Sequence, residues 1–253
     1  MNKLVNFPLV GLIASFVVLW LSVRIGASLR KLRSLEGDER EDYGFILTAS
    51  LTLLALIIGF TFSIAVGRYD QRKNYEEAEA NAIGTEYVRA GLLPAADAAR
   101  VRTLLRGYLE HRILFYQTRD DDRLRQIDSA TAQLETDLWS AVQAPAAAQP
   151  NALTALAVAG MNDVLNSEGY TQAAWLYRIP VSAWGLMGAI AICCNVLIGY
   201  GAHGTKAKGT LFLVLPLLMS ISFFLIADID TPRRGLIRVI PLNLSKLSQD
   251  LQK

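Results

Sequence analysis

The residue types that most often perform chemistry in proteins are few and scattered in this chain of 253 residues. Two histidines, His111 and His203, lie far apart in the sequence, and the two cysteines, Cys193 and Cys194, are adjacent within an apolar stretch. Neighbouring residues of a helix point about 100° apart, so we interpret the cysteines as small packing residues and not as a disulfide. No metal-ligand cluster, Cys–His pair or Ser–His–Asp set is indicated. We therefore expect no catalytic residues, no metal site, no cofactor and no enzyme activity.

One segment has the spacing of a nucleotide-binding motif. Residues 199–204 read Gly-Tyr-Gly-Ala-His-Gly and fit the pattern G-x-G-x-x-G. In a dinucleotide-binding unit this motif follows a strand and opens a helix, whereas here it follows a long apolar block. We interpret the segment as a flexible loop between two helices.

A stripe of small and hydroxylated side chains indicates a different kind of chemistry. It lies in an uncharged block at residues 44–67 and recurs every three or four residues: Thr48, Thr52, Ala55, Gly59 and Ser63, with Leu56 and Phe60 beside it. Such a stripe suits close packing between membrane helices, or the wall of a pore in which Leu56 and Phe60 form a hydrophobic constriction. One span per subunit cannot enclose a pore, so the second interpretation requires a closed ring of subunits.

Charged residues flank the uncharged blocks. Arg68 directly follows the stripe, where it could lie at a pore mouth or snorkel to lipid headgroups. Three carboxylates just beyond it indicate a solvated helix face or an acidic approach to a pore: Glu76, Glu77 and Glu79. Asp228 and Asp230 are expected to end a helix, with a cation site as the alternative.

Four apolar blocks must hold these residues in place, at 7–23, 44–67, 179–200 and 210–227, in a chain that is 52% apolar. Each is about as long as a bilayer requires, and a backbone in hydrocarbon must satisfy its own hydrogen bonds, so each is predicted to be a transmembrane helix. The first block could be a signal peptide, but it lacks a small-residue cleavage pattern and runs directly into Arg24, so we expect it to be retained.

An even number of spans places both termini and the central segment on one side of the membrane. The count of Lys and Arg near the spans favours the cytoplasm for that side. The formal net charge of +2, with basic residues scattered among acidic ones, does not favour nucleic acid as a partner. The lipid bilayer is the expected partner.

The central segment, 68–178, is predicted to be a helical cytoplasmic domain, followed after the fourth span by a cytoplasmic tail at 228–253. Its first helix continues from the second span, and its second begins near Pro94 with apolar residues at three- and four-residue spacing: Val101, Leu104, Leu105, Tyr108, Leu109 and Ile113. A third helix is expected at 124–142, with Leu134 and Leu138 facing inward, then a loop at 143–151 and a helix at 152–167. The fold class is therefore all-α.

Several short motifs resemble the bestrophin superfamily, in particular its short bacterial bestrophin-like branch. Residues 58–60, Ile-Gly-Phe, and 66–72, Val-Gly-Arg-Tyr-Asp-Gln-Arg, are similar to the second span of that family and the turn that leaves it. The continuation at 79–87 resembles the signature of the branch, and 101–108 its basic amphipathic helix. Residues 230–235 and the later Pro241-Leu242 resemble the stretch after the fourth span.

The resemblance implies a homopentameric channel that conducts small inorganic ions passively, anions such as chloride in particular, in the bacterial inner membrane. Carried over by position, its hydrophobic neck would comprise Thr52, Leu56 and Phe60 of the second span. The acidic cluster that binds calcium in eukaryotic members is missing, and Arg233 and Arg234 stand near its place, so calcium gating is not expected.

A second hypothesis is a non-conducting membrane sensor or scaffold whose helical domain binds a partner. It would be favoured if Thr48, Thr52 and Ser63 were buried between helices of one subunit. A transporter would be expected to carry charged groups within its spans, and all four blocks lack them.

Overall fold

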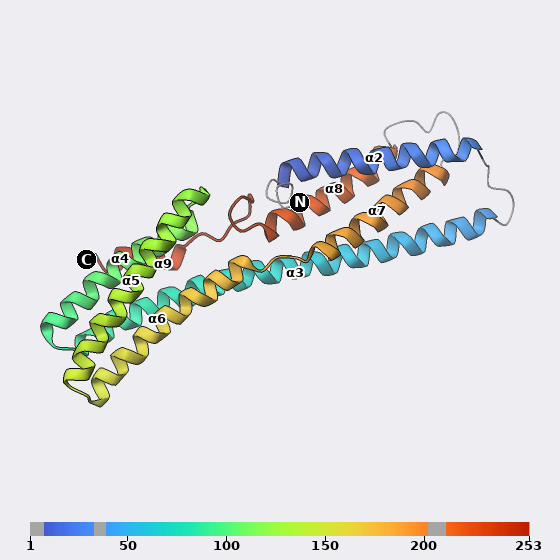
Figure 1. Cartoon of the computed structure of the whole chain (residues 1–253). Coiled ribbons are helices and arrows are strands. Elements are labelled where there is room, and N and C mark those ends of the chain that lie inside the picture. The colour runs from blue at the N-terminus through green and yellow to red at the C-terminus, as the bar shows by residue number, and fades with distance from the viewer. Residues whose placement is uncertain (1–7, 33–38, 202–210, 253) are drawn as a thin grey trace. The chain divides into compact units, whose positions relative to one another are not determined.

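The computed structural model describes residues 8–32, 39–201 and 211–252. Within these ranges the chain is helical and contains no strand, as the fold-class prediction requires. Its elements, in chain order, are α2 (Pro8–Leu32), α3 (Glu39–Arg89), the short 3₁₀ turn η1 (Ala90–Leu92), α4 (Ala95–Gln117), α5 (Asp121–Ala148), α6 (Ala152–Leu176), α7 (Val181–Gly201), α8 (Leu211–Asp230) and α9 (Leu242–Asp250) (Figure 1). His203 and residues 202–210, which include the start of the fourth predicted span, lie outside the described residues.

Four helical stretches are long and apolar enough to cross a membrane: Leu9–Lys31, Glu39–Leu92, Ala152–Gly201 and Phe212–Asp230. Each overlaps one of the four predicted spans. The predicted spans 44–67 and 179–200 lie wholly within their stretches, whereas 7–23 and 210–227 begin at residues outside the described ranges. The protein is an integral membrane protein with four candidate membrane helices.

The chain divides into two compact units. Unit 1 comprises residues 1–67 and 178–237, and in its described part α2 packs against α7 and α8 (Figure 1). A small apolar core joins all four helices of this unit through Leu19, Leu54, Ala191, Cys194 and Met219. Cys194 is buried in this core while Cys193 is exposed, so Cys194 is a packing residue, as the sequence predicted.

Two glycines allow α2 and α7 to approach closely. A Cβ atom on Gly26 would overlap the carbonyl oxygen of Val196, and one on Gly199 would overlap the carbonyl oxygen of Val23. Small residues permit this approach of two backbones within a membrane. The predicted flexible loop at 199–204 is therefore wrong at its start, because Gly199, Tyr200 and Gly201 form the last turn of α7.

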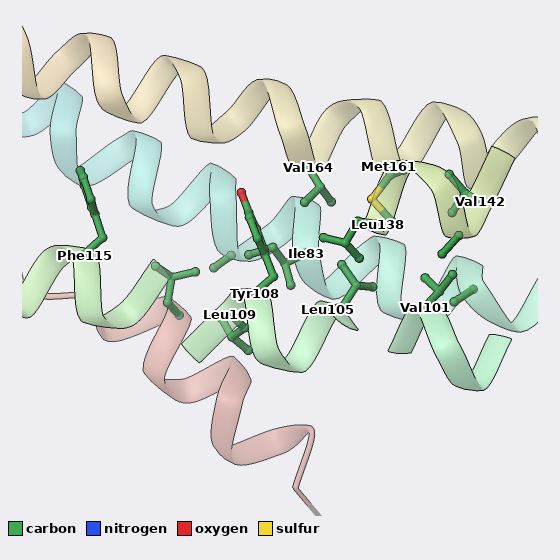
Figure 2. Close-up of a cluster of buried hydrophobic side chains, with 14 of the residues drawn as sticks. Ile83, Val101, Leu105, Tyr108, Leu109, Phe115, Leu138, Val142, Met161 and Val164 are labelled. Atoms are coloured by element: carbon green, nitrogen blue, oxygen red, sulfur yellow. The ribbon is translucent and has the colours of Figure 1, made fainter. Parts of the chain in front are cut away.

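Unit 2 comprises residues 68–177 and 238–253, and is a bundle formed by the second part of α3 with α4, α5, α6 and α9. Figure 2 shows its core, in which apolar side chains from several helices point toward one another. Four of the six apolar residues predicted to face inward from α4 are wholly or almost wholly buried there: Val101, Leu105, Tyr108 and Leu109. The other two, Leu104 and Ile113, are partly buried and pack against the same core. Pro94 occupies the position just before α4, also as predicted.

The loop predicted at 143–151 is wrong, because α5 continues through Pro145 to Ala148. Alanine has the highest helix propensity, and Pro145 together with Val142 is buried against the bundle, so packing outweighs the hydrogen bond that a proline removes. The connection is only 149–151. Asn151 then begins α6 by accepting hydrogen bonds from the backbone N–H groups of Leu153 (2.8 Å) and Thr154 (3.0 Å).

The helix predicted at 152–167 begins where expected but runs further, to Leu176. Its additional turns bury Thr171, Ala174 and Trp175 in unit 2. Burial of this face supports helix beyond the point at which the sequence pattern weakened.

Candidate functional site

The membrane part of α3 has one face buried within the chain and another that is open. The buried face contains Leu54, Thr61 and Ala65, which are 1%, 5% and 0% exposed and recur at spacings of seven and four. At about 100° per residue, Ser63 lies nine positions and therefore about 180° from Leu54. The stripe identified in the sequence thus lies opposite the face that packs in the chain.

Every residue of the stripe is exposed in the single chain: Thr48, Thr52, Ala55, Gly59 and Ser63. The two large apolar residues beside it are also exposed, Leu56 at 53% and Phe60 at 62%. A Cβ atom added to Gly59 would meet nothing within 4 Å, so this glycine does not serve helix packing inside the subunit. The structure therefore brings the predicted neck residues together on one open face.

The hydroxyl groups of this face are satisfied by their own helix. The Thr48 hydroxyl donates to the carbonyl oxygen of Gly44 (2.9 Å), and the Thr52 hydroxyl donates to that of Thr48 (2.9 Å). A shallow, open depression runs along the same side of α3 between Phe45 and Leu56. A face of this kind can border hydrocarbon, another subunit or water without leaving a buried donor unpaired.

Arg68 does not share the open face. It lies five residues after Ser63, about 140° around the helix, and is half-buried. It is also the first residue of unit 2.

The next turns of α3 carry a buried ionic cluster that the sequence analysis missed. The carboxylate of Glu79 and the guanidinium of Arg112 are both fully buried and form an ion pair through the Arg112 Nε atom. Glu79 Oε2 also accepts hydrogen bonds from the hydroxyls of Tyr116 (3.1 Å) and Thr171 (3.2 Å). Arg112 Nη1 lies 3.3 Å from Oε1 of Glu168, which completes the cluster.

The cluster shifts the pKa values of its members in a consistent way. Burial is the largest single influence on Arg112 and lowers its pKa, but Glu79, Tyr108 and Glu168 together outweigh burial and raise that pKa. Burial and the Glu79 carboxylate raise the pKa of Tyr116. Burial, with the nearby Glu168 carboxylate, raises the pKa of Glu135 to about 7. The cluster holds α3, α4 and α6 together through paired groups, an arrangement that stabilises one packing of the bundle.

Two more charged residues of α3 satisfy the ends of other helices. Glu76 accepts hydrogen bonds from the backbone N–H of Leu244 (2.9 Å) and the side-chain amide of Asn243 (2.7 Å) at the start of α9. Arg72 donates to the carbonyl oxygens of Ala174 (3.1 Å) and Tyr177 (3.3 Å) at the end of α6. These are the favourable partners for a helix N-terminus and C-terminus, respectively.

The prediction of a solvated acidic face at Glu76, Glu77 and Glu79 is therefore wrong for two of the three. Only Glu77 is exposed, whereas Glu76 and Glu79 are 1% and 0% exposed. The signal in the sequence was the spacing of Arg72, Glu76 and Glu79, which places them on one helix face together with the apolar Ile83. Charged residues in register with an apolar core stripe indicate buried, paired charges.

Asp228 and Asp230 hold backbone groups in unit 1. Asp228 accepts hydrogen bonds from the N–H groups of Leu236 (2.7 Å) and Ile237 (2.8 Å), and Asp230 accepts one from Ile179 (3.1 Å). Helix α8 ends at Asp230, as predicted. Among the described residues, no group of three or more His, Cys, Asp or Glu side chains is arranged to hold a metal ion.

These features define an all-helical membrane protein with a long, continuous α3. The membrane part of α3 has one open face, and its second part forms buried ion pairs within a helical bundle. The Bestrophin-like domain family matches residues 11–244, most of the chain. The chain belongs to the bestrophin-like family.

Solved structures agree on the fold. A bestrophin homologue from Klebsiella pneumoniae, crystallised with a single substitution, superposes with a TM-score of 0.67 at 12% sequence identity, covering 95% of this chain and 97% of that chain. A second substituted form gives 0.66 at 13% identity, over 95% of this chain and 97% of that chain. The structure of the homologue solved by zinc phasing gives 0.65 at 12%, over 95% and 96%.

At this level of identity the likeness establishes the fold, and not the residues that act. No curated protein sequence matches the chain.

Proposed function

We propose that this protein is an oligomeric, anion-conducting channel whose pore is lined by the open face of α3. Membership of the bestrophin-like family and the shared fold support an ion channel in general. In the proposed arrangement, Thr52, Leu56 and Phe60 form a hydrophobic neck, and Thr48, Gly59 and Ser63 line the wall beside it. Arg68, on a different side of α3, lies at the level of the mouth without lining the pore.

The observation that carries this proposal is the exposure of the whole stripe on the side of α3 opposite its packed face. A stripe that existed for packing inside the subunit would be buried, as Leu54, Thr61 and Ala65 are. Instead, Thr48, Thr52 and Ser63 are exposed, which removes the specific support that their burial would have given to a non-conducting scaffold.

A ring of subunits is required because one helix cannot surround a pore. Closed cyclic symmetry would place the same face of every α3 toward the axis, and we propose a pentamer by analogy with the family. The apolar side chains of Leu56 and Phe60 would then converge and restrict water in the neck, so ions would pass only when the neck is wetted or widened.

Anion preference is supported by the distribution of charge on α3. Residues 44–67 contain no carboxylate, and the first charged residue after them is Arg68. A cationic residue near a mouth raises the local concentration of anions, although salt screens the effect. We further propose that both termini, the 68–178 domain and the 228–253 tail lie on the cytoplasmic side of a bacterial inner membrane.

The neck is tested by Phe60→Ala in planar-bilayer recordings of the purified, reconstituted protein. Removing the ring should increase the open probability or the unitary conductance at least several-fold, because a wider and less apolar neck is easier to wet. Phe62→Ala is the matched control, since Phe62 lies on the same helix but about 200° from Phe60 and is 38% exposed. It should leave conductance unchanged.

The same preparation distinguishes the alternatives. Reversal potentials in a KCl gradient report the anion preference, and Arg68→Gln should reduce it. The absence of current and of ion flux from the wild type and from Phe60→Ala alike would contradict the channel and leave a membrane scaffold. A monomeric particle by native mass would remove the physical basis of the pore.

A further inference from the structure

Unit 1 contains a pocket that the proposed pore does not use. It has a volume of about 370 Å³ and is lined mainly by one side of α2, with Gly199 of α7 and Phe212 of α8 closing it. Because Gly199 carries no side chain, it adds only backbone to the wall of the pocket.

The pocket is cationic. Arg24 and Lys31 both line it, seven residues apart and therefore on one side of α2, with Ser28 between them. Among the residues that the structure describes, no Asp or Glu side chain lines it. The Ser28 hydroxyl donates to the carbonyl oxygen of Arg24 (2.9 Å), so it remains on the helix and leaves the two cations as the polar groups for a ligand.

The other end of the pocket is apolar and aromatic. Trp20 lines it, and the guanidinium of Arg24 lies over the Trp20 ring at 5.4 Å from the ring centroid. Tryptophan is enriched at the level of lipid headgroups, where its ring has an apolar body and a polar edge.

An exposed apolar track continues from the pocket along the same side of α2 toward its N-terminus. It consists of Ile13 and Val17, which are 66% and 43% exposed. They lie seven and three residues before Trp20, which places them on the same side of α2 as the pocket. This side of α2 therefore carries cations toward its C-terminal end and an apolar surface toward its N-terminal end.

We propose that this pocket binds one anionic phospholipid, with the phosphate between Arg24 and Lys31 and an acyl chain along Ile13 and Val17. Guanidinium and ammonium groups both bind phosphate oxygens. Two cations, with no carboxylate among the described lining residues, favour a lipid with net negative charge, such as phosphatidylglycerol, over a zwitterionic one. The apolar track favours a lipid over a free phosphate ion, because a phosphate ion has no acyl chain to contact the track.

This inference does not depend on conduction and is tested on the full-length protein purified in detergent. Native mass spectrometry would count the phosphatidylglycerol molecules retained per subunit over a series of lipid concentrations. The wild type should retain about one at low concentration. The double variant Arg24→Gln, Lys31→Gln should bind about 30-fold more weakly. Each cation near an anionic headgroup contributes about 5.5-fold to the affinity, and the two contributions multiply.

Two controls make the result specific. The charge-matched double variant Arg40→Gln, Lys73→Gln removes two exposed cations that do not line the pocket and should bind as the wild type does. Ser28→Phe fills the pocket without removing a charge and should also abolish binding, which decides the question if the Arg24 and Lys31 variant does not fold.

Other outcomes would overturn the proposal. Equal retention of phosphatidylglycerol by the wild type and the pocket variants would exclude this site. Equal retention of phosphatidylcholine would exclude recognition of charge. If inorganic phosphate displaced the lipid at a comparable concentration, the site would be one for a free anion and not for a lipid.

Discussion

The two parts of the continuous helix α3 differ in how their polar side chains are satisfied. In unit 1, from residue 39 to 67, the polar residues Thr48 and Thr52 are exposed and satisfied by their own backbone. In unit 2, from residue 68 to 89, Arg72 and Glu79 are buried and satisfied by residues distant in sequence. A hydroxyl that donates to its own helix can face lipid, protein or water without losing its hydrogen bond. A buried charge, in contrast, requires one particular partner.

This contrast implies unequal sensitivity to mutation. Substitutions on the open face of the membrane part should change stability little and be detected in conduction. Substitutions in the ionic part should change stability greatly, since removing one member of a buried pair leaves the other without compensation.

The largest effect is expected from Arg112→Met. It leaves the fully buried Glu79 without its cation and should reduce stability by about 3–5 kcal/mol. Thermal unfolding followed by circular dichroism in detergent measures the change. Arg125→Met is the matched control, because the Arg125–Asp122 pair is exposed, with side chains 72% and 78% accessible, and should contribute about 0–1 kcal/mol. Equal effects of the two variants would contradict the contrast.

A smaller effect, which depends on pH, is expected from Glu86→Gln. Glu86 is fully buried on α3, and neither of its carboxylate oxygens has a hydrogen-bond partner among the described residues. Burial raises its pKa to about 8, with Arg89 acting to lower it and Asp163 to raise it. Because the folded state holds this proton more tightly than the unfolded state does, the contribution of Glu86 to stability is lost as pH rises from about 4.5 to about 8.

The variant should therefore match the wild type near pH 4.5 and be more stable at pH 9, by about 1–3 kcal/mol. Melting temperatures measured in detergent from pH 4.5 to 9 give the difference. Glu77→Gln is the control on the same helix, since Glu77 is exposed, and its difference from the wild type should stay constant with pH. If the difference in melting temperature between Glu86→Gln and the wild type is also constant with pH, the pKa of Glu86 is not raised in the folded state.

The smallest effects come from a pair of identical substitutions, one in each part of the comparison. Thr171→Val removes a hydrogen bond to the buried Glu79 carboxylate and should cost about 1.5 kcal/mol. Thr52→Val removes only a bond to the preceding turn of the same helix and should change stability by less than about 0.5 kcal/mol. Equal losses in thermal unfolding would show that Thr52 is held by a contact outside its own helix.

Much of the fold could be predicted from the sequence because local pattern dictated it. Uncharged runs long enough to cross a bilayer can only be helical there, and the spacing of Val101, Leu105, Tyr108 and Leu109 identified the buried face of α4. The passage of α5 through Pro145 was missed, because a proline signal is local and the burial that overcame it depends on the neighbouring helices.

The sequence by itself determined that α3 carries a stripe of small and hydroxylated residues, and that charged residues follow it. Only the tertiary structure decided which side of α3 is packed, because Leu54, Thr61 and Ala65 and the stripe opposite them are equally compatible with a buried helix face. It also decided that Glu79 is buried rather than solvated, since its partners Arg112 and Thr171 are 33 and 92 residues away. Periodicity records which residues share a face, whereas the identity of what meets that face depends on contacts made across the whole chain.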